Sequence, residues 1–387
     1  NNNDLRGEYM FRKKKLDVSI LFFIIVFAII SVVTINSALT YLSSDVGNLA
    51  LKQCIWYLVG FLLVFIIFKL KNEYLYRNAW FFYALCNLLL LCLLLFAPPI
   101  NNSKCWFVIP KIGSFQPSEF TKISLMLVLG SMISNFRANY SDPTVKEEFI
   151  FLVKSFIVVL IPSILTFLEP DTGAVIIYFI IYLCMLFASG IRLRWFAILG
   201  GLALLAVGIV VGCYFTSEKL FVSIFGNNLY YRFERVFDWK SGSGLQLENA
   251  LAAIGSAGVF GHGYNKTPIY FPESGTDFIF AVFASNFGLL GSFLLLLLLV
   301  LFDGKLFVLA MKKISLTDKF VLAGVIGMLV FQQVQNIGMT IGLLPITGIT
   351  LPFISYGGSS LLSYMILIGI ILNINEEKGK YKYSYGL

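Results

Sequence analysis

Two carboxylates stand directly before a long apolar stretch late in the chain. Residues 270–280 read YFPESGTDFIF, with Asp277 beside an apolar run to Phe302 and Glu273 four residues upstream. A carboxylate at a boundary between water and lipid is partly desolvated, which raises its pKa and suits it to act as a general base. The spacing Ser274-x-x-Asp277 is also typical of a capping box, in which both side chains bond the first helical turn. The two roles are compatible.

A second ionisable pair lies in QPSEFTK, residues 116–122. Glu119 and Lys122 are three positions apart on one predicted helix face, so they can form an ion pair. Ionisable groups inside a membrane helix are costly and usually face a cavity or each other. The pair is therefore either a structural ion pair or part of a polar cavity in which Lys122 meets a phosphate.

Two further polar stretches interrupt apolar segments. LEPDTG at 168–173 predicts a tight turn in which Glu169 and Asp171 are turn and cap residues. After position 331, the polar residues Gln332, Gln333, Gln335 and Asn336 precede a segment rich in Gly, Pro, Ser and Thr that extends to 360. Irregular backbone at membrane depth needs protein or water to satisfy it. The segment is thus a re-entrant or cavity-lining loop, or its small residues allow close helix packing.

The composition indicates that these residues are positioned by membrane-spanning helices. Of 387 residues, 58% are hydrophobic and only 13% charged, with a mean hydropathy of +0.84. Soluble domains carry about 25% charged residues, so we predict an integral membrane protein. The +8 charge lies mostly in short loops, which argues against a nucleic-acid interface. The chain lacks Walker A, GxGxxG, GxSxG and HExxH motifs, so we predict neither a nucleotide-hydrolysing site nor a zinc protease site.

The fold prediction is an all-α polytopic bundle of about ten transmembrane helices. Basic residues concentrate in alternate loops, which places both termini in the cytoplasm. The stretch before Met10 has no cleavable signal pattern and is left out of the fold prediction. We expect cytoplasmic tails at 1–16 and 376–387, and a bundle over 17–375 with one large extracellular loop at 215–277. The predicted spans are 17–40, 49–69, 78–97, 119–136, 150–168, 172–190, 194–214, 278–302, 320–341 and 355–374.

The large loop contains a mixture of aromatic and charged residues. SEKLFVSIFGNNLYYRFERVF at 217–237 is compatible with an amphipathic helix lying in the membrane interface. It carries Arg232 and Arg235, two cations on the predicted outer side.

Five motifs, in one order, carry a family resemblance. They are Trp106 with FQPSE (115–119) and Lys122, EPDTG (169–173), GLQLENALAAIGSAGVFGHG (244–263), FPESGTDFIFAV (271–282) and LPITGITLPFISYGGSS (345–360). Over residues 17–375 the chain resembles the SEDS family of bacterial envelope proteins, named for shape, elongation, division and sporulation. The Trp106–FQPSE spacing and the TDFIFAV block are more similar to the RodA branch than to the FtsW branch.

The resemblance implies a peptidoglycan glycosyltransferase of the bacterial plasma membrane, serving cell elongation and shape. Its donor and acceptor would be lipid II, and its partner a class B penicillin-binding protein, in addition to membrane lipids; no nucleic acid is expected. The family's catalytic acid maps to Asp277, and its Glu-x-x-Lys pair maps to Glu119 and Lys122. Substrate contacts are further expected from Lys104, Trp106, Gln246 and Glu273. A departure is Ala284-Ser285-Asn286, where the family often has an acidic pair.

In the implied reaction Asp277 takes a proton from the acceptor sugar's hydroxyl as it attacks the donor's anomeric carbon. Lipid pyrophosphate then leaves, and its charge needs a cation. Candidates are Lys122, Arg232, Arg235 or a bound divalent ion, Mg²⁺ or Mn²⁺.

Two other functions remain open. A lipid II flippase needs a polar path to the cytoplasmic side and should not depend sharply on one outer acid. A non-catalytic scaffold that recruits a penicillin-binding protein predicts that Asp277→Ala is functional. A division or sporulation role is the alternative within the family.

Overall fold

The computed structural model describes residues 17–38, 49–99, 104–109, 113–226, 230, 245–312 and 314–377. Its described elements are helices and one antiparallel hairpin of β1 (Phe107–Ile109) and β2 (Gly113–Phe115). The helices are α1 (Val18–Ala38), α2 (Leu49–Leu70), α3 (Asn72–Arg77), α4 (Ala79–Phe96), α5 (Pro117–Asn139), α6 (Val145–Leu168), α7 (Thr172–Ala188), α8 (Leu193–Thr216), α9 (Glu218–Phe225), α11 (Leu245–Ser256), α12 (Ile279–Ala310), α13 (Leu316–Thr340) and α14 (Gly358–Glu377).

Ten of the described helices correspond in order to the ten predicted spans. Seven of them are long and apolar enough to cross a membrane, namely α1, α2, α4, α6, α8, α12 and α13. The helices α7 and α14 are shorter but apolar, and α5 has 23 residues with polar side chains along it. The prediction of an all-α polytopic protein is therefore confirmed.

The largest boundary difference is in α12, which continues to Ala310 instead of ending at 302. Hydropathy ended the predicted span at Asp303 and Lys305. In the structure both charges have partners, because Gln333 Nε2 donates to Asp303 Oδ1 (3.3 Å) and Lys305 Nζ lies 3.3 Å from Asp17 Oδ2. Partnered charges allow the helix to continue past them.

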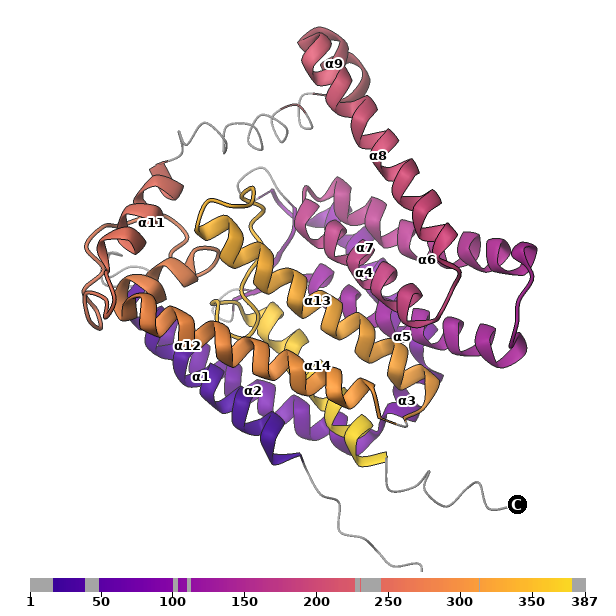
Figure 1. Ribbon diagram of the computed structural model, residues 1–387, viewed down its shortest axis with the longest axis horizontal. Helices are drawn as coiled ribbons and strands as arrows, with labels where there is room; N and C mark the ends of the chain where they lie inside the picture. The colour runs from indigo at the N-terminus through magenta and orange to yellow at the C-terminus, as the bar shows by residue number, and fades with distance from the viewer. Residues whose placement is uncertain are drawn as a thin grey trace, which may run out of the picture.

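The bundle has a buried centre and an exposed flank. The first half of α5 is almost entirely buried, and α13 and α14 pack beside it (Figure 1). By contrast, the apolar part of α8 has no buried residue, and α8 slants away from the bundle with α9 at its far end. The start of α1 and the end of α14 lie at the same lower edge in Figure 1, as an even number of spans requires.

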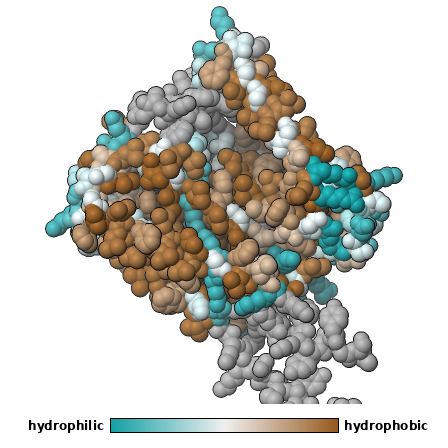
Figure 2. Space-filling view, viewed as in Figure 1, coloured by the Kyte–Doolittle hydropathy of each residue, from teal (hydrophilic) through white to brown (hydrophobic). Residues whose placement is uncertain are grey.

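The outer surface suits a lipid environment. Brown, hydrophobic residues cover most of the face in Figure 2, and hydrophilic residues lie at its edges and in a narrow stripe through its lower middle. Exposed Leu, Ile, Phe and Val side chains on helices long enough to span a bilayer are expected where lipid replaces water.

The helix α12 is broken at Gly288, where the backbone turns to φ 65° and ψ −161°. The loop at 257–263 fills the break: His262 N donates to Ser285 O (2.9 Å), and Leu289 N donates to Gly258 O (3.0 Å). A Cβ at Gly288 would lie 2.3 Å from Gly261 N, so only glycine fits this contact. The break leaves a short buried helix, 279–287, directly behind Asp277.

The predicted irregular segment is confirmed at 341–357, whereas the four polar residues before it lie on regular helix α13. Two of these residues hold the segment. Gln335 Nε2 donates to Pro345 O, and Asn336 Nδ2 donates to Ile349 O, each at 2.8 Å. Side-chain amides thus supply the hydrogen bonds that a non-helical backbone lacks when it is buried in a bundle.

The large loop contains helices α9 and α11. The helix α9 covers Glu218–Phe225 of the predicted amphipathic stretch and has polar and apolar sides. Arg232 and Arg235 lie outside the described residues, so their predicted role stays a prediction.

Candidate active site

Asp277 lies in a run of turns that ends where α12 begins. Glu273 O accepts from Thr276 N (3.2 Å) and Phe278 N (3.0 Å), and Glu273 adopts a positive φ of 54°. The N-cap of α12 is Phe278, which makes no side-chain capping bond. The capping-box prediction for Ser274 and Asp277 is therefore wrong, because the turn closes on the Glu273 carbonyl and Ser274 is buried.

The carboxylate of Asp277 is left free by this arrangement. It is half-buried, and among the described residues the groups that act on it are the apolar surroundings and the Glu273 charge, with no hydrogen-bond donor. Burial, and then the negative charge of Glu273, raise the pKa of Asp277 to about 7. An acid with a pKa near neutrality can accept a proton in one step and release it in the next, as general base catalysis requires.

Backbone contacts fix the turn from two sides. From the irregular segment, Ser355 Oγ donates to Thr276 O (2.6 Å) and Tyr356 N donates to Gly275 O (2.9 Å). From the large loop, Gln246 Nε2 donates to Pro272 O (3.0 Å). Gln246 was predicted as a substrate contact, and in the structure it holds the residue next to Glu273.

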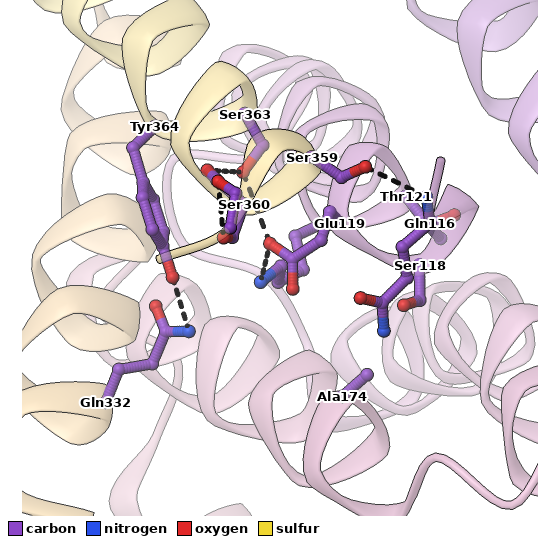
Figure 3. A network of polar contacts seen from close by, with 12 residues as sticks. Gln116, Ser118, Glu119, Thr121, Ala174, Gln332, Ser359, Ser360, Ser363 and Tyr364 are labelled. Atoms are coloured by element: carbon purple, nitrogen blue, oxygen red, sulfur yellow. Dashed lines mark hydrogen bonds and ion pairs between the residues drawn. The ribbon is translucent and has the colours of Figure 1, made fainter. Parts of the chain in front are cut away.

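Glu119 and Lys122 form the predicted ion pair, with Lys122 Nζ 2.6 Å from Glu119 Oε2. Ser363 Oγ donates to the same carboxylate oxygen at 3.3 Å, and the Tyr364 ring lies 5.7 Å from Nζ (Figure 3). Gln332 Nε2 extends the network by donating to the Tyr364 hydroxyl (2.9 Å). Since Lys122 is only 1% exposed, this conformation favours the structural ion pair, and phosphate binding by Lys122 stays a prediction.

The turn at 168–173 joins this network. Asp171 caps α7 through Ala174 N (3.0 Å), as predicted, and also accepts from Gln116 Nε2 (2.9 Å) and Ser118 Oγ (3.1 Å). Glu169 is fully buried, and neither of its carboxylate oxygens has a partner among the described residues. Burial, with the neighbouring Asp171 charge, raises the pKa of Glu169 to about 8.

One short stretch lies between the two acidic centres. A Cβ at Gly348 would be 3.4 Å from Asp277 Oδ2, and a Cβ at Gly173 would be 3.1 Å from the Ile349 side chain. Residues 347–349 therefore separate Asp277 from the Glu119 network. No hydrogen bond joins the two centres within the part of the chain that the structure describes.

The remaining predicted residues are dispersed. Lys104 Nζ donates to Leu94 O (3.0 Å) in the last turn of α4, and Trp106 is half-buried just before β1. The described residues include no group of three His, Cys, Asp or Glu side chains placed to hold a metal. A divalent ion near Asp277 would need phosphate oxygens from a substrate to complete its ligands.

The sequence singled out Asn336 as polar but did not predict its contact with the site, where its Nδ2 donates to the backbone carbonyl of Asp277 (2.8 Å). The available signal was an amide at a position of an otherwise apolar span, but it did not indicate the partner.

The chain is similar to curated bacterial proteins along most of its length. It is 36% identical over 299 residues to the probable peptidoglycan glycosyltransferase FtsW of Coxiella burnetii, covering 74% of this chain and 76% of that protein. It is 32% identical to the stage V sporulation protein E of Bacillus subtilis, covering 71% and 72%.

Solved structures share the fold. A chain from a peptidoglycan synthase complex that coordinates polymerization and crosslinking matches with a TM-score of 0.74 and 27% identity, covering 94% of this chain and 99% of that one. The rod shape determining protein RodA of Thermus thermophilus matches with a TM-score of 0.66 and 26% identity, covering 94% and 97%.

The model of the cell cycle protein family FtsW/RodA/SpoVE matches residues 17–380. This match spans nearly all of the chain and agrees with the fold and with both sets of relatives. The chain belongs to the FtsW/RodA/SpoVE family, the SEDS proteins, and is a multi-pass protein of the bacterial plasma membrane.

Proposed function

We propose that the chain is a peptidoglycan glycosyltransferase that polymerises lipid II at the outer face of the membrane. The FtsW relative bears that activity in its name, and a matching structure comes from a peptidoglycan synthase complex. The observation that carries the proposal is the free carboxylate of Asp277, which has a pKa of about 7 and lies just before the start of the membrane helix α12.

In the proposed reaction, the acceptor sugar's hydroxyl loses its proton to Asp277 while its oxygen bonds to the donor's anomeric carbon. The bond from that carbon to the lipid pyrophosphate breaks, and the pyrophosphate leaves with the electron pair. A leaving group of this kind needs no proton, so a single base is sufficient. The position of Asp277 suits a substrate whose sugar is in water and whose carrier is in lipid.

The charge of the leaving pyrophosphate needs a cation, and Lys122 is one candidate. Lys122 would have to exchange its bond to Glu119 for the substrate, since it is buried in the ion pair. Arg232 and Arg235 stay candidates. A class B penicillin-binding protein is the proposed partner, because the matched synthase complex couples polymerization to crosslinking.

The test is glycan polymerisation by the purified protein in liposomes that contain labelled lipid II. The reaction is run with and without the cognate class B partner, whose own polymerase activity is checked separately. Product length is read on a gel. Polymer formation supports the proposal. Transfer of lipid II between leaflets without polymer would instead support the flippase alternative, and neither activity would support a scaffold.

We further propose a role in cell elongation, which is supported by the TDFIFAV block and by the match to a rod shape determining protein. Division is the second candidate, because a curated relative is FtsW. A fluorescent fusion in the native cell separates them. Signal along the side wall and rounded cells on depletion support elongation, whereas signal at the septum and filamentous cells support division.

A further inference from the structure

Asn336 joins three parts of the molecule. It lies on α13, is fully buried, and uses both protons of its amide nitrogen. One donates to the backbone carbonyl of Asp277 and the other to the carbonyl of Ile349, each over 2.8 Å. A single side chain thus ties α13 to the turn before α12 and to the irregular segment.

Both accepted carbonyls belong to the surroundings of the Asp277 carboxylate. The first is that residue's own backbone oxygen. The second is on Ile349, next to Gly348, whose Cα faces Asp277 Oδ2. The amide therefore fixes the peptide that carries the carboxylate and the peptide that packs against it.

Among the described residues, other hydrogen bonds hold the turn at positions before Asp277. Ser355 binds the carbonyl of Thr276, and Tyr356 binds that of Gly275. Loss of the Asn336 amide would leave Asp277 without its tie to α13. The buried carbonyl of Ile349 and the part-buried carbonyl of Asp277 would also lose a donor, which buried backbone groups rarely tolerate without rearrangement.

We propose that Asn336 is a positioning residue for Asp277, which holds the carboxylate in its half-buried pose through the two backbone carbonyls. The kinetic test of this inference rests on the proposed function. A chemical test of the Asp277 carboxyl does not depend on that function.

The test compares Asn336→Leu with a matched control, Asn373→Leu. Asn373 is also a buried asparagine and lies near the C-terminal end of α14. Its Nδ2 donates to Ile67 O (3.0 Å) and to Asn72 Oδ1 (3.3 Å). Each variant removes a buried side-chain amide that links its own helix to another segment. Comparing their thermal unfolding in detergent therefore separates a general loss of stability from a specific effect on Asp277.

The chemical readout is labelling of Asp277 by dicyclohexylcarbodiimide, which reacts with protonated carboxyls in apolar surroundings. Peptide mass spectrometry with fragmentation separates Asp277 from Glu273, the charged group beside it. In the wild type and in Asn373→Leu we expect labelling to fall as pH rises through about 7, the pKa of Asp277. In Asn336→Leu we expect the midpoint at lower pH, since the released carboxyl gains water.

The kinetic readout is polymerisation at saturating lipid II. We expect Asn336→Leu to lower kcat by about 100-fold, the scale of a misplaced catalytic group, with KM little changed. Asn336→Ser retains one donor and should be intermediate in both readouts. If Asn336→Leu does not fold, Asn336→Ser decides the question.

A labelling midpoint and kcat equal to those of the wild type, in whichever variant is folded, would overturn the proposal. If the wild type makes no polymer but the labelling midpoint still shifts only in the Asn336 variants, the proposed function fails while the positioning role stands.

Discussion

The two acidic centres of this protein are held in opposite ways. Glu119 is bound through its side chain, by Lys122 and Ser363, in a network closed to solvent. Asp277 is bound through its backbone, by Asn336, while its carboxylate stays free and half-buried. A carboxylate saturated by donors is stabilised as an anion, and one held only by its peptide can exchange protons. The difference separates a structural acid from a reactive one.

The comparison is tested most strongly by Asp277→Asn, which keeps the shape and removes the base. We expect polymerisation to fall by at least about 100-fold, the usual contribution of a general base, with an unchanged unfolding temperature. Gel analysis of products from labelled lipid II measures it. Asp142→Asn, on a carboxylate whose side chain is 97% exposed, is the control. An active Asp277→Asn protein would remove the distinction between the centres.

At Glu119, in contrast, a substitution should act on stability. Lys122→Met leaves a buried carboxylate without its cation and should cost about 3–5 kcal/mol, whereas pairing it with Glu119→Gln should recover most of the loss. Unfolding in detergent, followed by size-exclusion fluorescence, measures both. Lys146→Met, at an exposed position on α6, is the control. A stable single variant would show that the pair is not structural, and that Lys122 is available for a ligand.

Glu169 is a third case, buried but without partners. Because folding raises its pKa to about 8, its protonated form is favoured in the folded state, and the associated stability is present below its unfolded pKa and is lost as pH rises through about 8. Glu169→Gln should remove this loss, so the two proteins should have similar stability at pH 4.5, and the variant should become progressively more stable than the wild type as pH rises to about 8. Parallel pH-dependent stability curves for the two proteins would contradict the assignment.

The smallest effect is expected at Glu273. Its charge contributes, after burial, to the raised pKa of Asp277. Glu273→Gln should therefore shift the acidic limb of the polymerisation rate to lower pH without abolishing activity. A rate profile measured between pH 5 and 9 checks this, with roughly equal ionic strength at each point because exposed charges are screened by salt. A complete loss of activity would instead make Glu273 a second catalytic acid.

Much of the bundle could be predicted because its signals are local. Apolar length placed most span boundaries within a few residues, and the Glu119–Lys122 spacing predicted a contact within one helix turn. The end of α12 was missed because the partners of Asp303 and Lys305 come from α13 and from the residue before α1.

The sequence predicted the candidate catalytic acid of the site, but not the residues that hold that acid in place. The family motif identified Asp277 as the candidate, whereas the residue that holds it is 59 positions away in the sequence. The capping-box prediction failed because the turn before α12 closes on the Glu273 carbonyl and not on the side chains of Ser274 and Asp277. Backbone carbonyls leave no trace in an amino-acid pattern, so contacts to them were not foreseen.

The break in α12 has a consequence for biogenesis. Gly288 lies nine residues beyond the start of α12, or about 14 Å along the helix axis. The backbone groups at the break find their partners only when the loop at 257–263 docks there. A nascent chain can insert the apolar run as one segment, but it cannot complete this contact until the loop has crossed to the outer side. We therefore expect the short helix behind Asp277 to be set in place only after this loop has been translocated.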